Sequence, residues 1–227
     1  LDAVHLASFE ESMVPLATEI VRALTSSRNP FVLAGLRREI IRAVESTGRS
    51  IDSFELMRLE RLSPEHARKL VSATAERHQV FINDETRDLL AQQLEGSPFF
   101  ITSFLQAARD KHVGLDSYFA CERLYVDELL GGQLQRSFAD VLERVAPHSE
   151  TRATVVQLLC EAASGRHRTV PVEGWSRRLK LDDFELNGLL QRLHAQELIN
   201  WDGESIDITG NSMVWKDYLR SRFRLDS

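Results

Sequence analysis

Apolar residues recur every three to four positions over most of the chain, the spacing at which side chains share one face of an α-helix. This pattern predicts an amphipathic helix over residues 10–24 and a run of helices between residues 63 and 146. It also predicts helices over residues 151–163, 171–179, 183–198 and 213–223. The sequence therefore predicts a mainly α-helical protein.

Two short segments have the pattern of strands instead. Residues 31–35 form an uninterrupted apolar run that follows the turn residues 26–30, as expected for a strand buried in a parallel sheet. Residues 54–59 are a second strand candidate. Two strands have open edges and too little apolar surface to be stable alone. We therefore expect them to be the remnant of a larger α/β sheet whose other strands lie outside the chain.

The last 80 or so residues have a different order of elements. Three predicted helices are followed by two short strands, at residues 199–201 and 205–208, which are joined by Asp202 and Gly203. An Asp-Gly pair between strands is typical of a β-hairpin. Three helices followed by a two-stranded ribbon is the order of a winged helix, a variant of the helix-turn-helix.

A helix junction lies near the middle of the chain, where residues 95–101 read E-G-S-P-F-F-I. Gly96 is suited to the left-handed conformation that closes a helix, and Pro98 to the first turn of the next helix. A similar start is predicted at Ser63 and Pro64, with Ser63 as the N-cap. Both signals mark predicted helix starts within the helical segment between residues 63 and 146.

The composition excludes several protein classes. The chain has 227 residues, of which 43% are hydrophobic and 27% charged, and its net charge is −6. Such a charge argues against a protein that coats nucleic acid, and no apolar run is long enough to span a membrane. Cys121 and Cys160 lie far apart in helical patterns, so we expect buried free thiols and a cytoplasmic protein. The chain begins without Met, and we expect it to be part of a longer polypeptide.

Three motifs in this order resemble the C-terminal half of the AAA+/STAND class of P-loop ATPases. They are A-G-L at residues 34–36, L-S-P-E-H-A at residues 62–67 and G-S-P at residues 96–98. The resemblance implies that residues 1–62 end the nucleotide domain with its sensor 1 strand, that 63–146 form a four-helix lid, and that 147–227 form a winged helix. It also implies ATP or ADP with Mg²⁺ as ligand, held mainly by residues outside this chain.

The resemblance implies candidate nucleotide-binding residues. Gly96, Ser97 and Pro98 would turn a helix N-terminus toward the nucleotide, although they also suit a plain helix junction. Arg37 and Arg38 follow the sensor strand and would reach a phosphate as an arginine finger, although solvated arginines on a helix face have the same pattern.

The chain departs from the family in one respect that decides activity. It contains no G-x-x-x-x-G-K-[ST] phosphate loop and no strand ending in Asp-Glu. We therefore expect ATP hydrolysis only if a phosphate loop lies outside the chain, and no catalytic residue is assigned. The histidines do not cluster, so no metal site is predicted, and no nucleophile elbow is present.

The winged-helix region carries basic residues that are candidates for contacts to a DNA backbone, namely Arg166, Arg168, Arg177, Arg178 and Lys180. Acidic residues open the predicted recognition helix, however, namely Asp182, Asp183 and Glu185. Phosphates would be repelled at that helix N-terminus, where base contacts are usually made. A winged helix that binds a protein or inhibits its own nucleotide domain is the other possibility.

These observations leave three hypotheses for function. The first is a nucleotide-dependent switch or ATPase subunit of the AAA+/STAND type, with a protein partner or self-association through the lid or winged helix. The second is a winged-helix DNA-binding or transcription-regulatory protein without ATPase activity. The third is a helical scaffold without a ligand. No membrane partner is expected.

Overall fold

The computed structural model is mainly helical and describes residues 2–5, 19, 22–24, 26, 31–57, 60–164, 169–208 and 212–226. The chain divides into two compact units. The first comprises residues 1–58, 143–151 and 166–209, and the second comprises residues 59–142, 152–165 and 210–227. Among the described residues, no helix combines the length and the apolar character needed to cross a bilayer.

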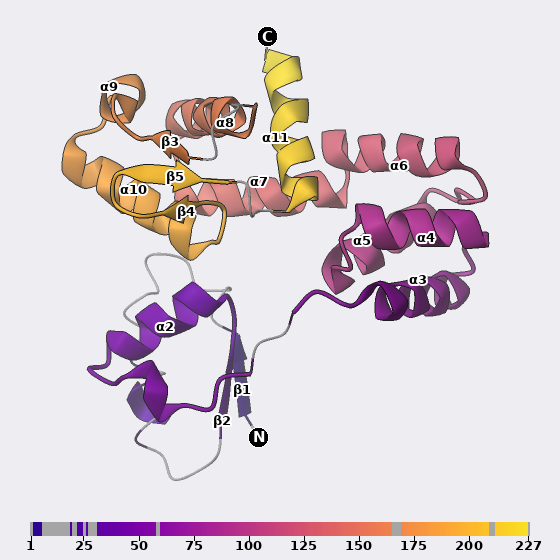
Figure 1. The fold of residues 1–227 in the computed structure, drawn as a ribbon, viewed down its shortest axis with the longest axis horizontal. Coiled ribbons are helices and arrows are strands. Elements are labelled where there is room, and N and C mark those ends of the chain that lie inside the picture. The colour runs from indigo at the N-terminus through magenta and orange to yellow at the C-terminus, as the bar shows by residue number, and fades with distance from the viewer. Residues whose placement is uncertain are drawn as a thin grey trace. The chain divides into compact units, whose positions relative to one another are not determined.

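The first unit contains a two-stranded parallel sheet (Figure 1). Strand β1 (Asp2–His5) pairs with β2 (Phe31–Ala34) in the register Asp2 to Phe31. Strand β2 confirms the predicted strand, whereas β1 was not predicted because its sequence, D-A-V-H, is not an apolar run. The predicted helix over residues 10–24 lies mostly outside the described residues, although Glu19 and residues 22–24 are helical.

The second predicted strand, over residues 54–59, is wrong for the four residues that the structure describes. A 3-10 helix, η3 (Ile51–Ser53), precedes them, and residues 54–57 are not in a strand. Phe54 and Ile51 instead pack against the buried Val44 of helix α2 (Arg37–Glu45). Leu56 and Met57 are 55% and 82% exposed. Of the apolar residues in this segment, Phe54 therefore packs in a small cluster against α2, while Leu56 and Met57 are exposed.

The C-terminal part of the chain has the order of elements of a winged helix, as predicted. After α8 (Ser149–Ser164) come β3 (Thr169–Pro171), α9 (Trp175–Leu179), α10 (Asp183–Ala195), β4 (Asn200–Trp201) and β5 (Ser205–Asp207). The three strands form an antiparallel sheet in the order β3, β5, β4. Strand β3 was not predicted, because Pro171 suggested a helix start. The helix begins at Trp175 instead.

The β4–β5 hairpin closes as its sequence predicted. The Asp202 carboxylate accepts hydrogen bonds from the backbone N–H groups of Glu204 and Ser205, and Gly203 has a positive φ. These hydrogen bonds hold the pKa of Asp202 below its usual range. The hairpin, β3, α9 and α10 lie in the first unit, whereas α8 from Arg152 onward lies in the second. The domain boundaries after residues 62 and 146 stay predictions.

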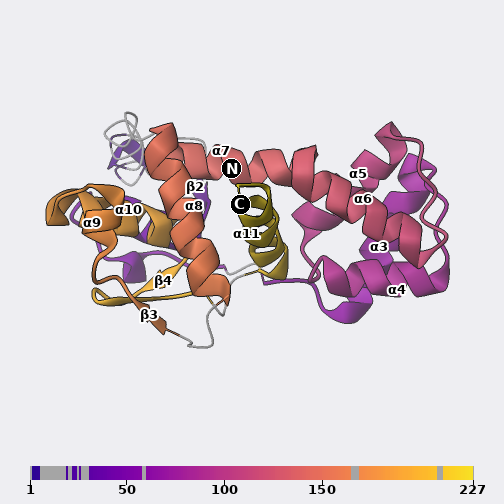
Figure 2. The ribbon, with the colours of Figure 1, turned by 90° about the horizontal axis from the view of Figure 1, so that it is seen from above.

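The second unit is built from helices (Figures 1 and 2). They are α3 (Pro64–His78), α4 (Asp84–Gln93), α5 (Pro98–Asp110), α6 (Tyr118–Gly131), most of α7 (Gln133–Val145), most of α8, and α11 (Met213–Asp226). Helix α3 packs on α4 and α5, and α6 contacts α4, α5 and α11. The first four each begin after a polar N-cap, at Ser63, Asn83, Ser97 and Ser117. Such caps satisfy backbone N–H groups that the helix leaves free.

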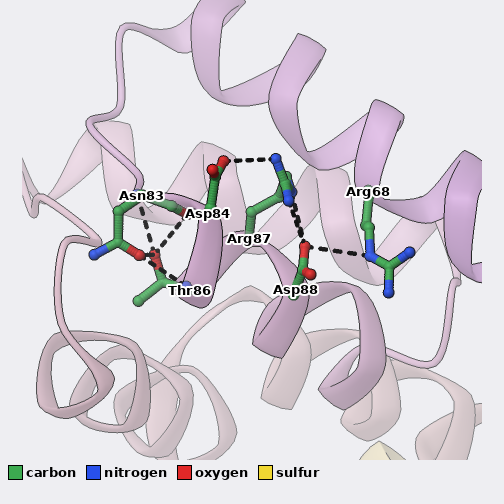
Figure 3. A network of polar contacts seen from close by, with 6 residues as sticks. All are labelled: Arg68, Asn83, Asp84, Thr86, Arg87 and Asp88. Atoms are coloured by element: carbon green, nitrogen blue, oxygen red, sulfur yellow. Dashed lines mark hydrogen bonds and ion pairs between the residues drawn. The ribbon is translucent and has the colours of Figure 1, made fainter.

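Polar contacts fix the start of α4 and its position on α3 (Figure 3). Asn83 and Thr86 form a capping box, in which each side chain accepts a hydrogen bond from the backbone N–H of the other. The Asp88 carboxylate lies 2.8 Å from Arg87 of its own helix and 3.2 Å from Arg68 of α3. Exposed ion pairs contribute little to the free energy of unfolding. The main effect of this network is therefore on the position of α4 relative to α3.

Both cysteines are buried free thiols, as predicted. Burial raises the pKa of Cys121 to about 11, because a thiolate is poorly solvated in an apolar surrounding. The Cys160 thiol donates a hydrogen bond to the backbone oxygen of Leu219, at 2.8 Å. Neither thiol therefore has the features of a reactive cysteine.

Aromatic rings join three helices of the second unit. The Phe138 ring of α7 lies 5.1 Å from the rings of both Trp215 and Tyr218 on α11, and 6.0 Å from Phe100 on α5. Trp215 and Tyr218 stack on each other at 5.5 Å. Trp215 is 2% exposed, and its indole N–H has no hydrogen-bond partner among the described residues.

Trp215 therefore has two separable contributions to stability. We expect Trp215→Ala to lower the free energy of unfolding by about 3–5 kcal/mol, because it empties a buried aromatic site. Trp215→Phe should cost far less, because it keeps a ring and removes an unpaired buried donor. Urea denaturation measures both variants. Equal losses for Phe and Ala would contradict this account.

Candidate functional site

The predicted helix junction around Gly96 is held against the segment that leads into α3. Glu95 and Gly96 both adopt the left-handed conformation, with φ of 54° and 63°. The backbone N–H of Leu62 donates to the Gly96 oxygen at 3.0 Å, and a β-carbon on Gly96 would lie 2.5 Å from the Leu62 oxygen. Glycine is therefore required here by the approach of a second backbone segment as well as by φ.

Ser97 and Pro98 start α5 in the way that the sequence predicted. Pro98 occupies the first turn, and the Ser97 hydroxyl accepts a long hydrogen bond, 3.4 Å, from the backbone N–H of Phe100. Phe99 is half exposed and packs edge-on against Phe100, with ring centroids 5.6 Å apart. The first turn of α5 thus presents a hydroxyl, free backbone N–H groups and an aromatic ring.

Glu95 is a central residue of this junction that sequence reasoning missed. One carboxylate oxygen lies 2.8 Å from the Arg61 guanidinium. The other accepts hydrogen bonds from the Ser212 hydroxyl and from the backbone N–H of Met213, the latter at 3.0 Å. Glu95 therefore caps the N-terminus of α11 from more than a hundred residues away. No local pattern distinguishes it from any other acid that precedes a helix end.

The junction fits part of a nucleotide rather than all of it. The N-terminus of α5 is favourable for negative charge, and the Phe99 ring suits a base. Arg61, the cation that contacts the junction through an ion pair, is already bound to Glu95. The described residues of the junction therefore offer a helix N-terminus and an aromatic ring, and binding of the triphosphate and Mg²⁺ would need residues outside it.

Arg38 contacts the winged-helix elements of its own unit. Its guanidinium donates to the backbone oxygens of His194 and Ile199, at 2.7 and 2.8 Å, and to the side chain of Asn200. These acceptors join the end of α10 to β4. Arg38 therefore links α2 to the winged-helix sheet in this structure. The side chain of Arg37 lies outside the described residues.

His194 is neutral in this setting. Its Nδ1 accepts a hydrogen bond from the backbone N–H of Trp201 at 3.0 Å and lies 3.2 Å from the Arg38 guanidinium. Burial lowers the pKa of His194, and the positive charge of Arg38 lowers it further. A protonated imidazole would lose the Trp201 hydrogen bond and face a like charge.

The candidate DNA-binding residues are only partly described. Arg166 and Arg168 lie outside the described residues, while Arg177 and Arg178 are exposed in the last turn of α9. The Lys180 amine lies 2.9 Å from Glu150, whose pKa this contact lowers. Arg177 and Arg178 therefore lie on one short helix, and Lys180 lies directly after its end.

The start of α10 is acidic and carries an exposed aromatic residue. Asp182 and Glu185 form a capping box, which engages both carboxylates with backbone N–H groups. Asp183 adds a further negative charge in the first turn. Phe184, between them, is 88% exposed. An exposed aromatic residue is more typical of a protein interface than of a DNA backbone contact.

Comparison with known proteins adds no family. The sequence matches no family model, and it matches none of the curated proteins with which it was compared. Within the described part of the chain, no group of histidine, cysteine and acidic side chains is arranged to hold a metal ion.

Gly96→Ala tests whether the junction needs its glycine. We expect a loss of about 2 kcal/mol or more in the free energy of unfolding, from the left-handed φ and from the clash with Leu62. Gly114→Ala is the matched control, because a β-carbon there meets nothing within 4 Å. Chemical denaturation of both variants gives the comparison, and similar stabilities would contradict the packing account.

Arg38→Ala tests the contact between α2 and β4. Loss of charged hydrogen bonds to two backbone oxygens should cost about 2 kcal/mol, whereas Arg49→Ala, at an exposed site, should cost little. The pKa of His194 should rise in the Arg38 variant, as followed by NMR titration.

The same variant should change how stability depends on pH. Because the folded-state pKa of His194 lies below 6.5, its contribution is present above pH 6.5 and is lost as pH falls through and below that value. Arg38→Ala should make this acid loss smaller. An unchanged His194 pKa, with stability equal to that of the Arg49 variant, would show that Arg38 does not act in this way.

Proposed function

We propose that this chain supplies the sensor strand, helical lid and winged helix of a nucleotide-dependent switch of the AAA+/STAND type. ATP or ADP with Mg²⁺ would be held mainly by residues outside the chain, because the sequence has no phosphate loop. Hydrolysis would depend on that loop. The order of elements supports the proposal: a parallel strand pair, a helical segment and the strand-helix-helix-hairpin order of a winged helix.

The observation that carries the proposal is the connectivity of the Gly96 junction. One loop contacts the segment leading into the lid through Leu62 and caps α11 through Glu95. It also forms the free N-terminus of α5. A nucleotide bound at that N-terminus would therefore contact the loop that joins three parts of the second unit. A switch needs such a coupling between ligand and more than one element.

The strand pair gives independent support. Strands β1 and β2 pair in parallel, and a two-stranded parallel sheet rarely stands alone. Val32 in β2 is 44% exposed, although strands of a parallel sheet are usually covered on both faces. An α/β sheet completed by residues outside the chain would explain both facts.

Binding of DNA through the winged helix is the second candidate. The order of elements and the exposed Arg177 and Arg178 favour it. The acidic start of α10 opposes it, and the exposed Phe184 favours a protein partner or self-association at the same place. We therefore rank protein contact above DNA contact for this surface.

Nucleotide titration of the full-length protein tests the first proposal. We expect ATP or ADP with Mg²⁺, at about a hundred times its dissociation constant, to stabilise the protein by about 2.7 kcal/mol, a shift of several degrees in Tm. Phe99→Ala should weaken this effect, while Phe119→Ala, at an 82% exposed site on α6, should leave it unchanged.

Two outcomes would count against the ranking. No rise in Tm with either nucleotide would remove the switch. A rise in fluorescence anisotropy of a labelled DNA duplex, falling steeply with salt and lost in Arg177→Gln with Arg178→Gln, would place DNA binding first.

A further inference from the structure

A cleft in the second unit is separate from the Gly96 junction. It has a volume of about 480 Å³, within the range of small-molecule sites. Helices α3, α5, α6 and α7 supply its walls, all within one compact unit. Most of the residues that line it have polar side chains, and they include Thr74, Arg77, His78, Ser103, Lys111 and Arg136.

The two acids that line the cleft are already engaged. Glu128 is 2% exposed, with one carboxylate oxygen 2.9 Å from the Lys111 amine and the other 2.6 Å from the backbone N–H of Gln133. A β-carbon on Gly132 would lie 2.2 Å from this carboxylate, so the chain passes directly against it. Glu128 is thus fixed in place and neutralised by Lys111.

Asp110 is held in a similar way. The Arg109 guanidinium donates to one of its oxygens at 2.8 and 3.0 Å, and the Gln106 amide lies 3.1 Å from both oxygens. The contact with Arg109, followed by that with Gln106, lowers the pKa of Asp110. Both acids are therefore held by donors from the protein itself, and neither is free to attract a cationic ligand.

The arginines of the cleft differ from the acids in this respect. Arg77, in the last turn of α3, makes no hydrogen bond or ion pair with any described residue. Among the described residues, the guanidinium of Arg136 in α7 makes two long contacts of 3.4 Å, to the Gly131 oxygen and to the Gln133 side chain. Both arginines are exposed residues that line the same cleft, and neither has a carboxylate partner among the described residues.

Two hydroxyl groups are also available. Thr74 is 4% exposed and lines the cleft, and its hydroxyl has no hydrogen-bond partner among the described residues. The hydroxyl of Ser103 on the facing helix α5 has none in that part of the chain either. A hydroxyl at the wall of a cleft can both donate a hydrogen bond to a ligand oxygen and accept one from a ligand donor.

We propose that this cleft binds a small phosphate-bearing molecule, with Arg77 and Arg136 on the phosphate and the Thr74 and Ser103 hydroxyls on its polar oxygens. Guanidinium groups suit phosphate because their planar donors match two oxygens at once. The cleft carries this excess of free positive charge in a chain whose net charge is −6. The inference does not rest on the proposed nucleotide switch.

Inorganic pyrophosphate is the probe for a direct test on the 227-residue chain. Isothermal titration calorimetry at constant ionic strength should give one site per chain. Arg77→Gln and Arg136→Gln should each weaken binding about tenfold, since each removes a charged hydrogen-bond donor. Arg123→Gln, at an exposed arginine of α6 outside the cleft, is the matched control and should bind as the unchanged chain does.

Two further measurements make the test specific. NMR spectra should show shifts for the backbone of residues 74–78 and 103–107 but not for Ser97 to Phe99. Citrate, a polycarboxylate of similar charge, should bind more weakly than pyrophosphate. Ribose 5-phosphate and AMP, compared with pyrophosphate, show whether a sugar or a nucleoside is preferred.

The proposal is overturned if pyrophosphate does not bind, or if the Arg77 and Arg136 variants bind as the Arg123 variant does. Citrate binding as tightly as pyrophosphate would also overturn the phosphate class. Since this test uses no phosphate loop and no Mg²⁺, its failure is distinguishable from failure of nucleotide binding by the full-length protein.

Discussion

The Glu95 carboxylate is the interaction that connects distant segments of the second unit. It joins three segments that are far apart in sequence: Arg61 before α3, the α4–α5 junction itself, and the start of α11 at Ser212 and Met213. A single acid can do this because its two oxygens accept from different directions. The aromatic cluster around Phe138 then packs α11 against α7 and α5. Capping fixes where α11 begins, and ring packing fixes which face it buries.

The sequence predicted the elements whose signals are local. These signals are the N-cap Ser63, Pro98 in the first turn of α5, the Asp202–Gly203 turn and the apolar run at residues 31–35. Each depends on neighbours within a few positions, and the structure has the predicted element in each place. The prediction of a strand at residues 54–59 was wrong over the described residues. A short apolar run does not show whether it packs in a sheet or against a single helix. Phe54 pairs with the cluster around Val44.

The candidate site was only partly accessible to the same reasoning. Gly96, Ser97 and Pro98 were correctly identified as a junction, but the segment that makes Gly96 obligatory approaches from Leu62, and the cap on α11 comes from Glu95. Arg38 has the sequence pattern of a solvated arginine and instead donates to backbone oxygens more than 150 residues away. Contacts of this kind depend on tertiary structure, which residue type and spacing do not encode.

The approach of Gly132 to Glu128 has a consequence for how this sequence can vary. No side chain fits at position 132 while a carboxylate occupies its present place, because the first carbon of that side chain would overlap the acid. The acid in turn holds Lys111 and the first N–H of α7. Positions 128 and 132 are therefore expected to change together among related sequences: an acid at the first should occur with glycine at the second, and a smaller residue at the first should release that restriction.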